Sequence, residues 1–137
     1  CLSRGLGDVY KRQVLGIHYE IENAKLDQPI DQIPFSPIVE PTASHMAELF
    51  KDKEADLILF GHNHTLHHFV QEDTAYFNPG SAGLNRAPYT VYGIVTITPE
   101  QFNVEQVRVV YDNERFIDGF ETKQVPGRQL IFDKFIQ

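Results

Sequence analysis

Asp56 to His64, with the sequence DLILFGHNH, is the stretch that decides the fold of this chain of 137 residues. Leu57 to Phe60 is a continuous apolar run, which is typical of a strand covered on both faces. Two histidines follow the run, with one residue between them. Because α/β sheets bind ligands beyond the carboxyl ends of their strands, His62 and His64 stand where a binding site is expected.

The residues before this strand complete a strand, helix, strand pattern. Val14 to Ile17 is a short apolar run that ends at His18 and indicates a buried strand. Residues 27 to 41 hold four prolines and predict a loop. Thr42 is the predicted N-cap of a helix over Ala43 to Lys53, with lysines in its last turn. The pattern predicts a parallel βαβ unit, which brings His18 to the same sheet edge as the other two histidines.

Shorter strands and then helices are predicted for the rest of the chain. Two hairpins are expected, one around the turn-like Glu72-Asp73 and one around residues 99 to 101. Helical spacing of apolar residues follows from Asp112 onward. The predicted strands are 67–71, 74–77, 89–98 and 102–111, and the predicted helices are 113–123 and 128–136.

Composition and charge restrict the possible partners and compartment. The formal net charge is −7, and an acidic surface repels phosphate backbones, so no stable nucleic-acid complex is expected. The single cysteine excludes an internal disulfide. No segment approaches the roughly 20 apolar residues of a membrane span, and no membrane partner is expected. A cytoplasmic location is predicted, and the oligomeric state is left open.

The histidine spacing is suited to metal binding. In extended backbone, residues i and i+2 point the same way, so His62 and His64 can converge on one ion or reach two ions about 3.5 to 4 Å apart. With His18 they form a set suited to Mn, Zn, Fe or Ni. The alternatives are that the pair consists of surface loop residues and that His18 is a structural residue. The other three histidines, His45, His67 and His68, are interpreted as non-ligands.

Three motifs together resemble one enzyme family. DLILFGHNH at 56–64, AYFNPGSAG at 75–83 and IHY at 17–19 are similar to the C-terminal half of the calcineurin-like metallophosphoesterases, in the small bacterial phosphodiesterase branch. The resemblance spans about Val14 to Val95. It implies an α/β fold, namely the C-terminal portion of a four-layer αββα sandwich with mixed sheets, whose N-terminal half is missing.

The resemblance also implies a dinuclear site and a reaction. By the family pattern His18 and His62 are ligands of the second metal, and His64 is a ligand of the first. The implied cofactors are two divalent ions. The implied activity is that of a hydrolase, in which a metal-bridged hydroxide attacks a small phosphodiester or phosphomonoester substrate.

Four further residues are candidates for contact with substrate. Asn78 and Ser81 belong to an Asn-Pro-Gly-Ser turn, which either supports the metal loop or contacts substrate through Ser81 or a nearby amide. The planar fork of Arg86 suits a phosphate oxygen, although an exposed ion pair is the simpler interpretation. Tyr19 is placed to line the rim of a substrate cleft.

The residues before His18 depart from the family pattern. Residues 1 to 17 contain none of the family motifs D-x-H, G-D-x-x-D or G-N-H-[DE], and Asp8 is not assigned as a ligand. The last six residues of CLSRGLGDVYKRQ resemble a translated transposase-end adapter used in sequencing libraries. Residues 1–13 are therefore expected to be non-native and loosely placed, and 14–137 to be the C-terminal part of one domain that is inactive alone.

Two other functions stay open. One is a non-catalytic protein-interaction scaffold, since the retromer subunit with this fold serves mainly as a binding platform. The other is a mononuclear metal-binding domain unrelated to phosphoesters. Retention of His18, His62 and His64 favours the enzyme, because a scaffold has no need of them.

Overall fold

The computed structural model describes residues 3–4, 12–19, 41–84, 87–98 and 101–136. The chain divides into two compact units, of which the first comprises Cys1–Asn63 with His67–Asn78 and the second comprises His64–Leu66 with Pro79–Gln137. Most of the predicted proline-rich loop, and Arg86, lie outside the described residues. Within the described part of the chain, every helix is too short or too polar to cross a membrane.

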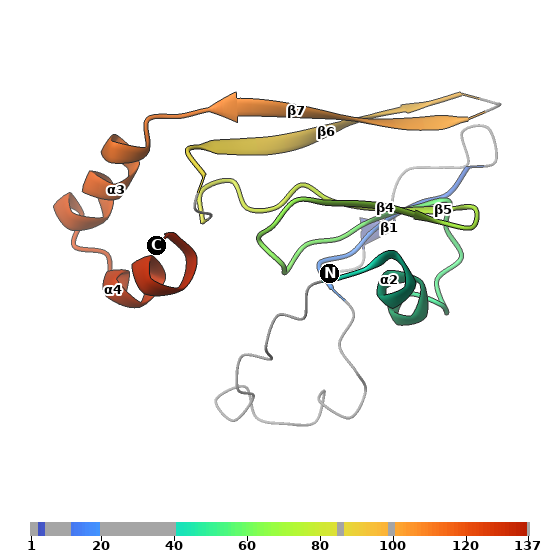
Figure 1. The fold of residues 1–137 in the computed structure, drawn as a ribbon, viewed down its shortest axis with the longest axis horizontal. Helices are drawn as coiled ribbons and strands as arrows, with labels where there is room; N and C mark the ends of the chain where they lie inside the picture. The colour runs from blue at the N-terminus through green and yellow to red at the C-terminus, as the bar shows by residue number, and fades with distance from the viewer. Residues whose placement is uncertain (1–2, 5–11, 20–40, 85–86, 99–100, 137) are drawn as a thin grey trace, which may run out of the picture. The chain divides into compact units, whose positions relative to one another are not determined.

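The first unit is built on a mixed five-stranded sheet (Figure 1) with the order β1-β2-β3-β5-β4. β3 pairs in parallel with both β2 and β5, whereas the edge strands β1 and β4 pair antiparallel with β2 and β5. The α/β class and the parallel pairing of the two predicted strands before and after the helix are confirmed. The bounds are β1 Ser3–Arg4, β2 Val14–Gly16, β3 Leu57–Leu59, β4 His67–Gln71 and β5 Thr74–Asn78.

Helix α2, Ala43–Leu49, packs on this sheet and supplies much of its core. Thr42 is the N-cap as predicted, and its Oγ1 accepts a hydrogen bond from the N–H of His45 at 3.2 Å. The helix ends at Phe50, so the predicted extension to Lys53 is wrong, and the chain turns with the N–H of Lys53 donating to the Phe50 carbonyl at 2.8 Å. The buried core cluster is Met46, Phe50, Ile58, Phe60 and Tyr76.

The first hairpin belongs to the same sheet. Its turn is at the predicted place, and Glu72 there has a φ of 53°. β5 also pairs in parallel with β3, in the register Leu57 to Ala75. The sequence predicted only antiparallel strands beyond residue 65. β5 is buried from Ala75 to Asn78, and this burial fits an interior strand of the sheet.

The second unit contains the second hairpin and the C-terminal helices. β6, Tyr89–Ile97, and β7, Phe102–Val110, form a two-stranded antiparallel sheet. α3, Asn113–Thr122, begins after the N-cap Asp112. α4, Arg128–Ile131, continues into a single π-helical turn, η1, at Phe132–Ile136. These elements confirm the predicted strands and helices of this region to within one residue at most ends.

The described residues of the opening stretch make specific contacts. Ser3–Arg4 pairs with β2, and Arg12 Nη1 lies 2.7 Å from Asp56 Oδ1. The N–H of Gln13 donates to the other oxygen of Asp56 at 2.7 Å. Burial alone would raise the pKa of the Asp56 carboxyl, but the Gln13 N–H and the Arg12 guanidinium outweigh it and hold the pKa below its usual range. The expectation of loose placement is wrong for Arg12 and Gln13, and a non-native origin stays a prediction.

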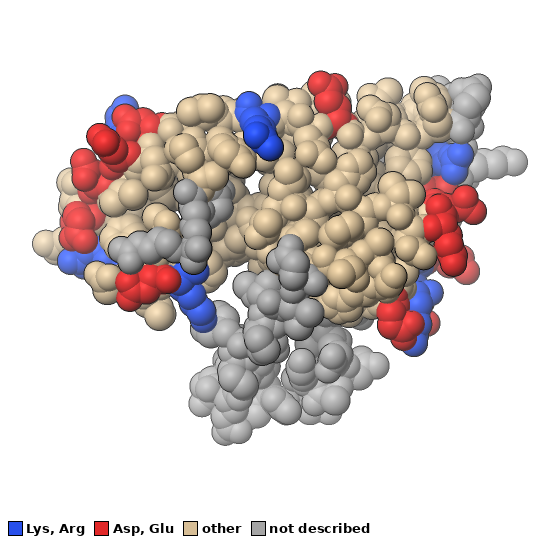
Figure 2. Space-filling model, in the orientation of Figure 1, with Lys and Arg blue, Asp and Glu red and all other residues tan. Residues whose placement is uncertain are grey.

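Charged side chains of both signs are scattered over the face shown in Figure 2. Acidic side chains outnumber basic ones along α3, where Glu114, Asp118 and Glu121 stand with Arg115. A further basic residue, Arg128 of α4, lies close to Glu121. The last two form an ion pair at 2.9 Å.

Candidate metal centre

His18 and His62 lie side by side because the parallel pairing of β2 and β3 continues beyond both strands. The N–H of Ile17 donates to the Leu59 carbonyl at 2.9 Å, and the N–H of Gly61 donates to the His18 carbonyl at 2.7 Å. The two imidazole rings meet edge to face, with their centroids 5.7 Å apart. Both side chains are exposed. The sequence-based expectation that these two histidines share one sheet edge is thus confirmed.

The backbone at His62 forms a tight turn. His62 has a φ of 66°, and the N–H of Asn63 donates to the Gly61 carbonyl, two residues back, at 2.8 Å. A three-residue turn with positive φ at its centre is rare for a residue with a side chain and costs about 1 to 3 kcal/mol. A Cβ at Gly61 would lie 3.3 Å from His18 Nδ1, so glycine there lets the two segments approach. Such strain persists only where neighbouring groups hold it.

Asn78 is the group that holds this turn. Its side-chain N–H₂ donates to the carbonyl of Asn63 at 2.6 Å and to that of Gly61 at 3.3 Å, so it binds the backbone on both sides of His62. Asn78 is 0% exposed at the end of β5. These contacts and this burial fit support of the loop, and the predicted contact of Asn78 with substrate stays a prediction.

Tyr19 packs directly on His62. The two rings are tilted by 31° with centroids 4.9 Å apart, and Tyr19 also meets Phe50 edge to face at 6.5 Å. Burial raises the pKa of the Tyr19 phenol, so the hydroxyl keeps its proton at neutral pH. The described contacts of Tyr19 restrict the orientation of His62, and its predicted role at the substrate rim stays a prediction.

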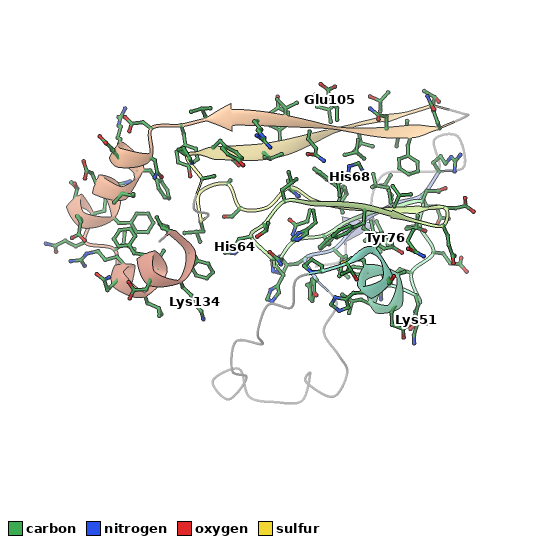
Figure 3. All side chains as sticks on the ribbon, in the orientation of Figure 1. Lys51, His64, His68, Tyr76, Glu105 and Lys134 are labelled. Atoms are coloured by element: carbon green, nitrogen blue, oxygen red, sulfur yellow. The ribbon has the colours of Figure 1, made fainter. Side chains whose placement is uncertain are left out.

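His64 begins the second unit, in the loop that leads to β4 (Figure 3). Its Nδ1 lies 3.1 Å from the Leu84 carbonyl oxygen. Because a carbonyl only accepts, this nitrogen carries a proton, and in the neutral imidazole the lone pair that a metal ligand needs is then on Nε2. Metal-binding histidines are commonly oriented in this way by a second hydrogen bond.

The loop after β5 wraps around His64. The N–H of Ser81 donates to the His64 carbonyl at 3.1 Å, and Ser81 Oγ accepts from the N–H of Leu84 at 2.9 Å. Gly80 has a φ of 82°, and a Cβ there would stand 2.8 Å from the His64 carbonyl oxygen. Ser81 is half-buried, and its predicted contact with substrate stays a prediction.

A C-terminal aromatic ring covers part of His64. Phe135, in η1, lies with its centroid 4.7 Å from that of His64 at a tilt of 35°. Sequence reasoning missed this contact, because 71 residues separate the two side chains and no local pattern links them.

The nitrogen donors fit borderline divalent ions. Two imidazoles on one ion, with metal–nitrogen bonds of about 2.0–2.1 Å, have centroids roughly 5 Å apart, which is close to the 5.7 Å between His18 and His62. Among the residues that the structure describes, no three His, Cys, Asp or Glu side chains form a group able to hold a metal. A ligand set of three or more histidines therefore stays a prediction.

A separate surface hollow of about 420 Å³ lies between α2 and the β4–β5 turn. It is lined by charged groups such as Glu48 and Lys51 and by the aromatic side chains of Phe50 and Tyr76. None of the predicted site residues lines it. This hollow is therefore distinct from the histidine pair.

His18 and His62 lie beyond the carboxyl ends of two parallel strands, which is where α/β sheets bind their ligands. The chain belongs to the calcineurin-like phosphoesterase superfamily, because the model of that superfamily domain matches residues 4–100. The suspected family is thereby confirmed. No curated protein matches the chain significantly.

A solved structure shares the fold of this chain. The chain is similar to hypothetical protein PH1004 from Pyrococcus horikoshii OT3, with 16% identity and a TM-score of 0.63 over 92% of this chain and 47% of that one. A Zn²⁺ complex of Vps29 from Entamoeba histolytica is 19% identical, with a TM-score of 0.40 over 55% of this chain and 50% of that one. The chain spans about half the length of these structures.

Proposed function

We propose that His18 and His62 bind one divalent metal ion, that His64 binds a second, and that the site hydrolyses a small phosphoester. When bound, such divalent ions would lower the pKa of a coordinated water to about 7 and would offset the charge on the attacking and leaving oxygens. The family supports phosphoester chemistry. The proposal covers Mn, Zn, Fe or Ni as the metals, and a phosphodiester or a phosphomonoester as the substrate.

The observation that carries the proposal is the hydrogen bond between His64 Nδ1 and the Leu84 carbonyl. Of the two neutral tautomers, this contact favours the one with the proton on Nδ1 and the lone pair on Nε2, and neutral imidazole is the form that binds metals. The chain's own residues thus bind and orient the ions, while Tyr19 and Ser81 are proposed to contact substrate together with Arg86.

The test is hydrolysis of bis(p-nitrophenyl) phosphate and p-nitrophenyl phosphate with Mn²⁺ or Zn²⁺ added. The family pattern also calls for D-x-H, G-D-x-x-D and G-N-H-[DE] motifs, which do not stand before His18. The assay therefore uses protein that also contains a segment with these three motifs. That segment is either joined to this chain or added as a second chain. We expect His64→Ala to lower kcat/KM more than about 100-fold, since even groups that merely orient a metal ligand are worth 10–100-fold.

His68→Ala is the matched control, because His68 is an exposed histidine on β4 whose ring meets Phe77. We expect its activity to stay within about twofold of wild type, as for surface substitutions. If wild type shows no metal-dependent hydrolysis above His64→Ala, the enzyme proposal fails, and a scaffold role becomes the better interpretation.

A further inference from the structure

The C-terminal segment Asn113–Ile136, which comprises α3, α4 and η1, contacts the loop that holds His64 at two points. Phe135 packs on the His64 ring with centroids 4.7 Å apart. Phe116 of α3 lies against Gly83, where a Cβ would come within 3.2 Å of its ring. Both contacts are inside the second unit. The segment lies beyond residues 4–100, so it is outside the part of the chain that defines the family.

From these contacts we propose that Phe135 is a positioning residue, which sets the orientation of the His64 imidazole and thereby the metal affinity of that histidine. The inference rests on the proposed function, because it assumes that His64 binds a metal. Phe135 touches neither metal nor substrate in this proposal and acts only through the ring of His64.

Two restraints together orient the His64 ring. The hydrogen bond from Nδ1 to Leu84 restricts the direction of one ring edge. It leaves the ring free to rock about that bond, because hydrogen bonds tolerate a broad range of angles at the carbonyl oxygen. The tilted ring of Phe135, at 4.7 Å and 35°, limits this rocking on the side of the imidazole that it contacts.

The local backbone around Phe135 supports a dedicated arrangement. Residues Phe132–Ile136 form a π-helical turn, which is rare and is frequently found at functional sites. A hydrogen bond of 2.8 Å from Gln129 Nε2 to Asp133 Oδ1 joins α4 to this turn. Phe132 faces a different neighbour, the ring of Phe120, at 5.3 Å. The π turn thus places the ring of Phe132 against α3 and the ring of Phe135 against His64.

The test measures Zn²⁺ affinity of the 137-residue chain by competition with a chromophoric chelator. We expect Phe135→Ala to weaken binding about 10-fold or more, as for groups that orient a metal ligand, with the Tm and far-UV circular dichroism unchanged. Phe135→Tyr should restore the affinity, since it keeps the ring. Leu130→Ala is the matched control in the same segment, because Leu130 is 64% exposed.

Nuclear magnetic resonance gives a second readout that needs no metal. The carbon-bound ring protons of His64 should shift in Phe135→Ala, because the ring current of the phenyl group is lost. If Phe135→Ala unfolds the chain, Phe135→Leu, which keeps apolar volume without a planar face, replaces it in both measurements.

The outcomes separate the two proposals. The proposed function gives one ion to His18 and His62 and a second to His64, so the competition must count the bound Zn²⁺ ions. If His64→Ala binds as many Zn²⁺ ions as wild type and with the same affinities, the metal-binding role of His64 is overturned, and the role of Phe135 with it. If His64→Ala weakens binding while Phe135→Ala keeps wild-type affinity, only the positioning role is overturned. Weaker binding in both variants, with rescue by Phe135→Tyr, supports both.

Discussion

His62 and Asn78 show how single residues hold the histidine pair. His62 occupies a backbone conformation that costs free energy, and the Asn78 amide donates to the carbonyls on both sides of it. Because these carbonyls are bound by a buried side chain, the turn keeps its shape without help from water. Asn78 acts on the turn through two hydrogen bonds, and both are donated by the N–H₂ group of its side chain.

Replacing Asn78 by aspartate tests this arrangement with almost no change in shape. Aspartate cannot donate when ionised, so the carbonyls of Asn63 and Gly61 lose the Asn78 donor, the Gly61 carbonyl keeps the N–H of Asn63, and a charge is buried beside both. We expect a loss of roughly 3 kcal/mol or more in the free energy of unfolding, measured by urea denaturation. Asn103→Asp, the same change on the exposed face of β7, should stay within about 0.5 kcal/mol of wild type. Equal stability of the two variants would contradict the supporting role of Asn78.

The conformation and burial of single residues were the features least predictable from the sequence. His18 and His62 were expected to meet, because parallel strands bring their carboxyl ends together. The reversal of φ at His62 and the burial of Asn78 depend on tertiary contacts between segments 15 residues apart or more. An Asn-Pro-Gly-Ser turn indicates its own geometry, but it does not indicate which backbone groups its first side chain will meet.

Among the elements, the loop Pro79–Leu84 carries the most specific geometry. Gly80 has positive φ, and its missing side chain leaves room for the His64 carbonyl. Ser81 and Leu84 then close three hydrogen bonds around His64. The loop therefore works as a rigid support for one histidine, and its conformation depends on glycine at position 80.

Gly80→Ala tests the loop, and Gly119→Ala is its control. Alanine at position 80 meets a strained φ and a backbone oxygen at 2.8 Å, so we expect a loss of about 2 kcal/mol or more in the free energy of unfolding. Gly119 lies within α3, and a Cβ there meets nothing within 4 Å. Alanine at 119 should be stabilising by about 0.5 to 1 kcal/mol because of its helix propensity. In thermal unfolding, we expect the Tm of Gly80→Ala to lie below that of wild type and the Tm of Gly119→Ala to lie above it.

Element types were predictable from apolar pattern, and element pairing was predictable only in part. The run before Gly61 and the two hairpins were found where alternation and turn residues indicated them. The parallel pairing of β5 with β3 was not predicted, because the sequence of a hairpin does not show which other strand of the sheet it will pair with. The early end of α2 at Phe50 reflects a turn that propensity alone does not indicate.

At the scale of the whole chain, Asp56 links the opening stretch to the main sheet. Its carboxylate accepts from Arg12 and from the N–H of Gln13, and the Gln13 carbonyl accepts from the N–H groups of Asp56 and Leu57. These bonds align the start of β2 with the start of β3. The alignment passes along both strands to the histidine pair, so a group far from the site contributes to its register.

The pH dependence of folding should report this link. The folded pKa of Asp56 is lowered, so its contribution to stability is present above the unfolded pKa of about 3.9 and is lost as pH falls through the folded value. Asp56→Asn should therefore lower the free energy of unfolding by roughly 1 to 2 kcal/mol at pH 7, and the difference from wild type should vanish at pH values below the folded pKa. Glu54→Gln, at an exposed carboxylate two residues away, should change stability by less than about 0.5 kcal/mol at either pH. A difference between Asp56→Asn and wild type that is constant from pH 7 down to acid unfolding would mean that the ionised carboxylate does not join these segments.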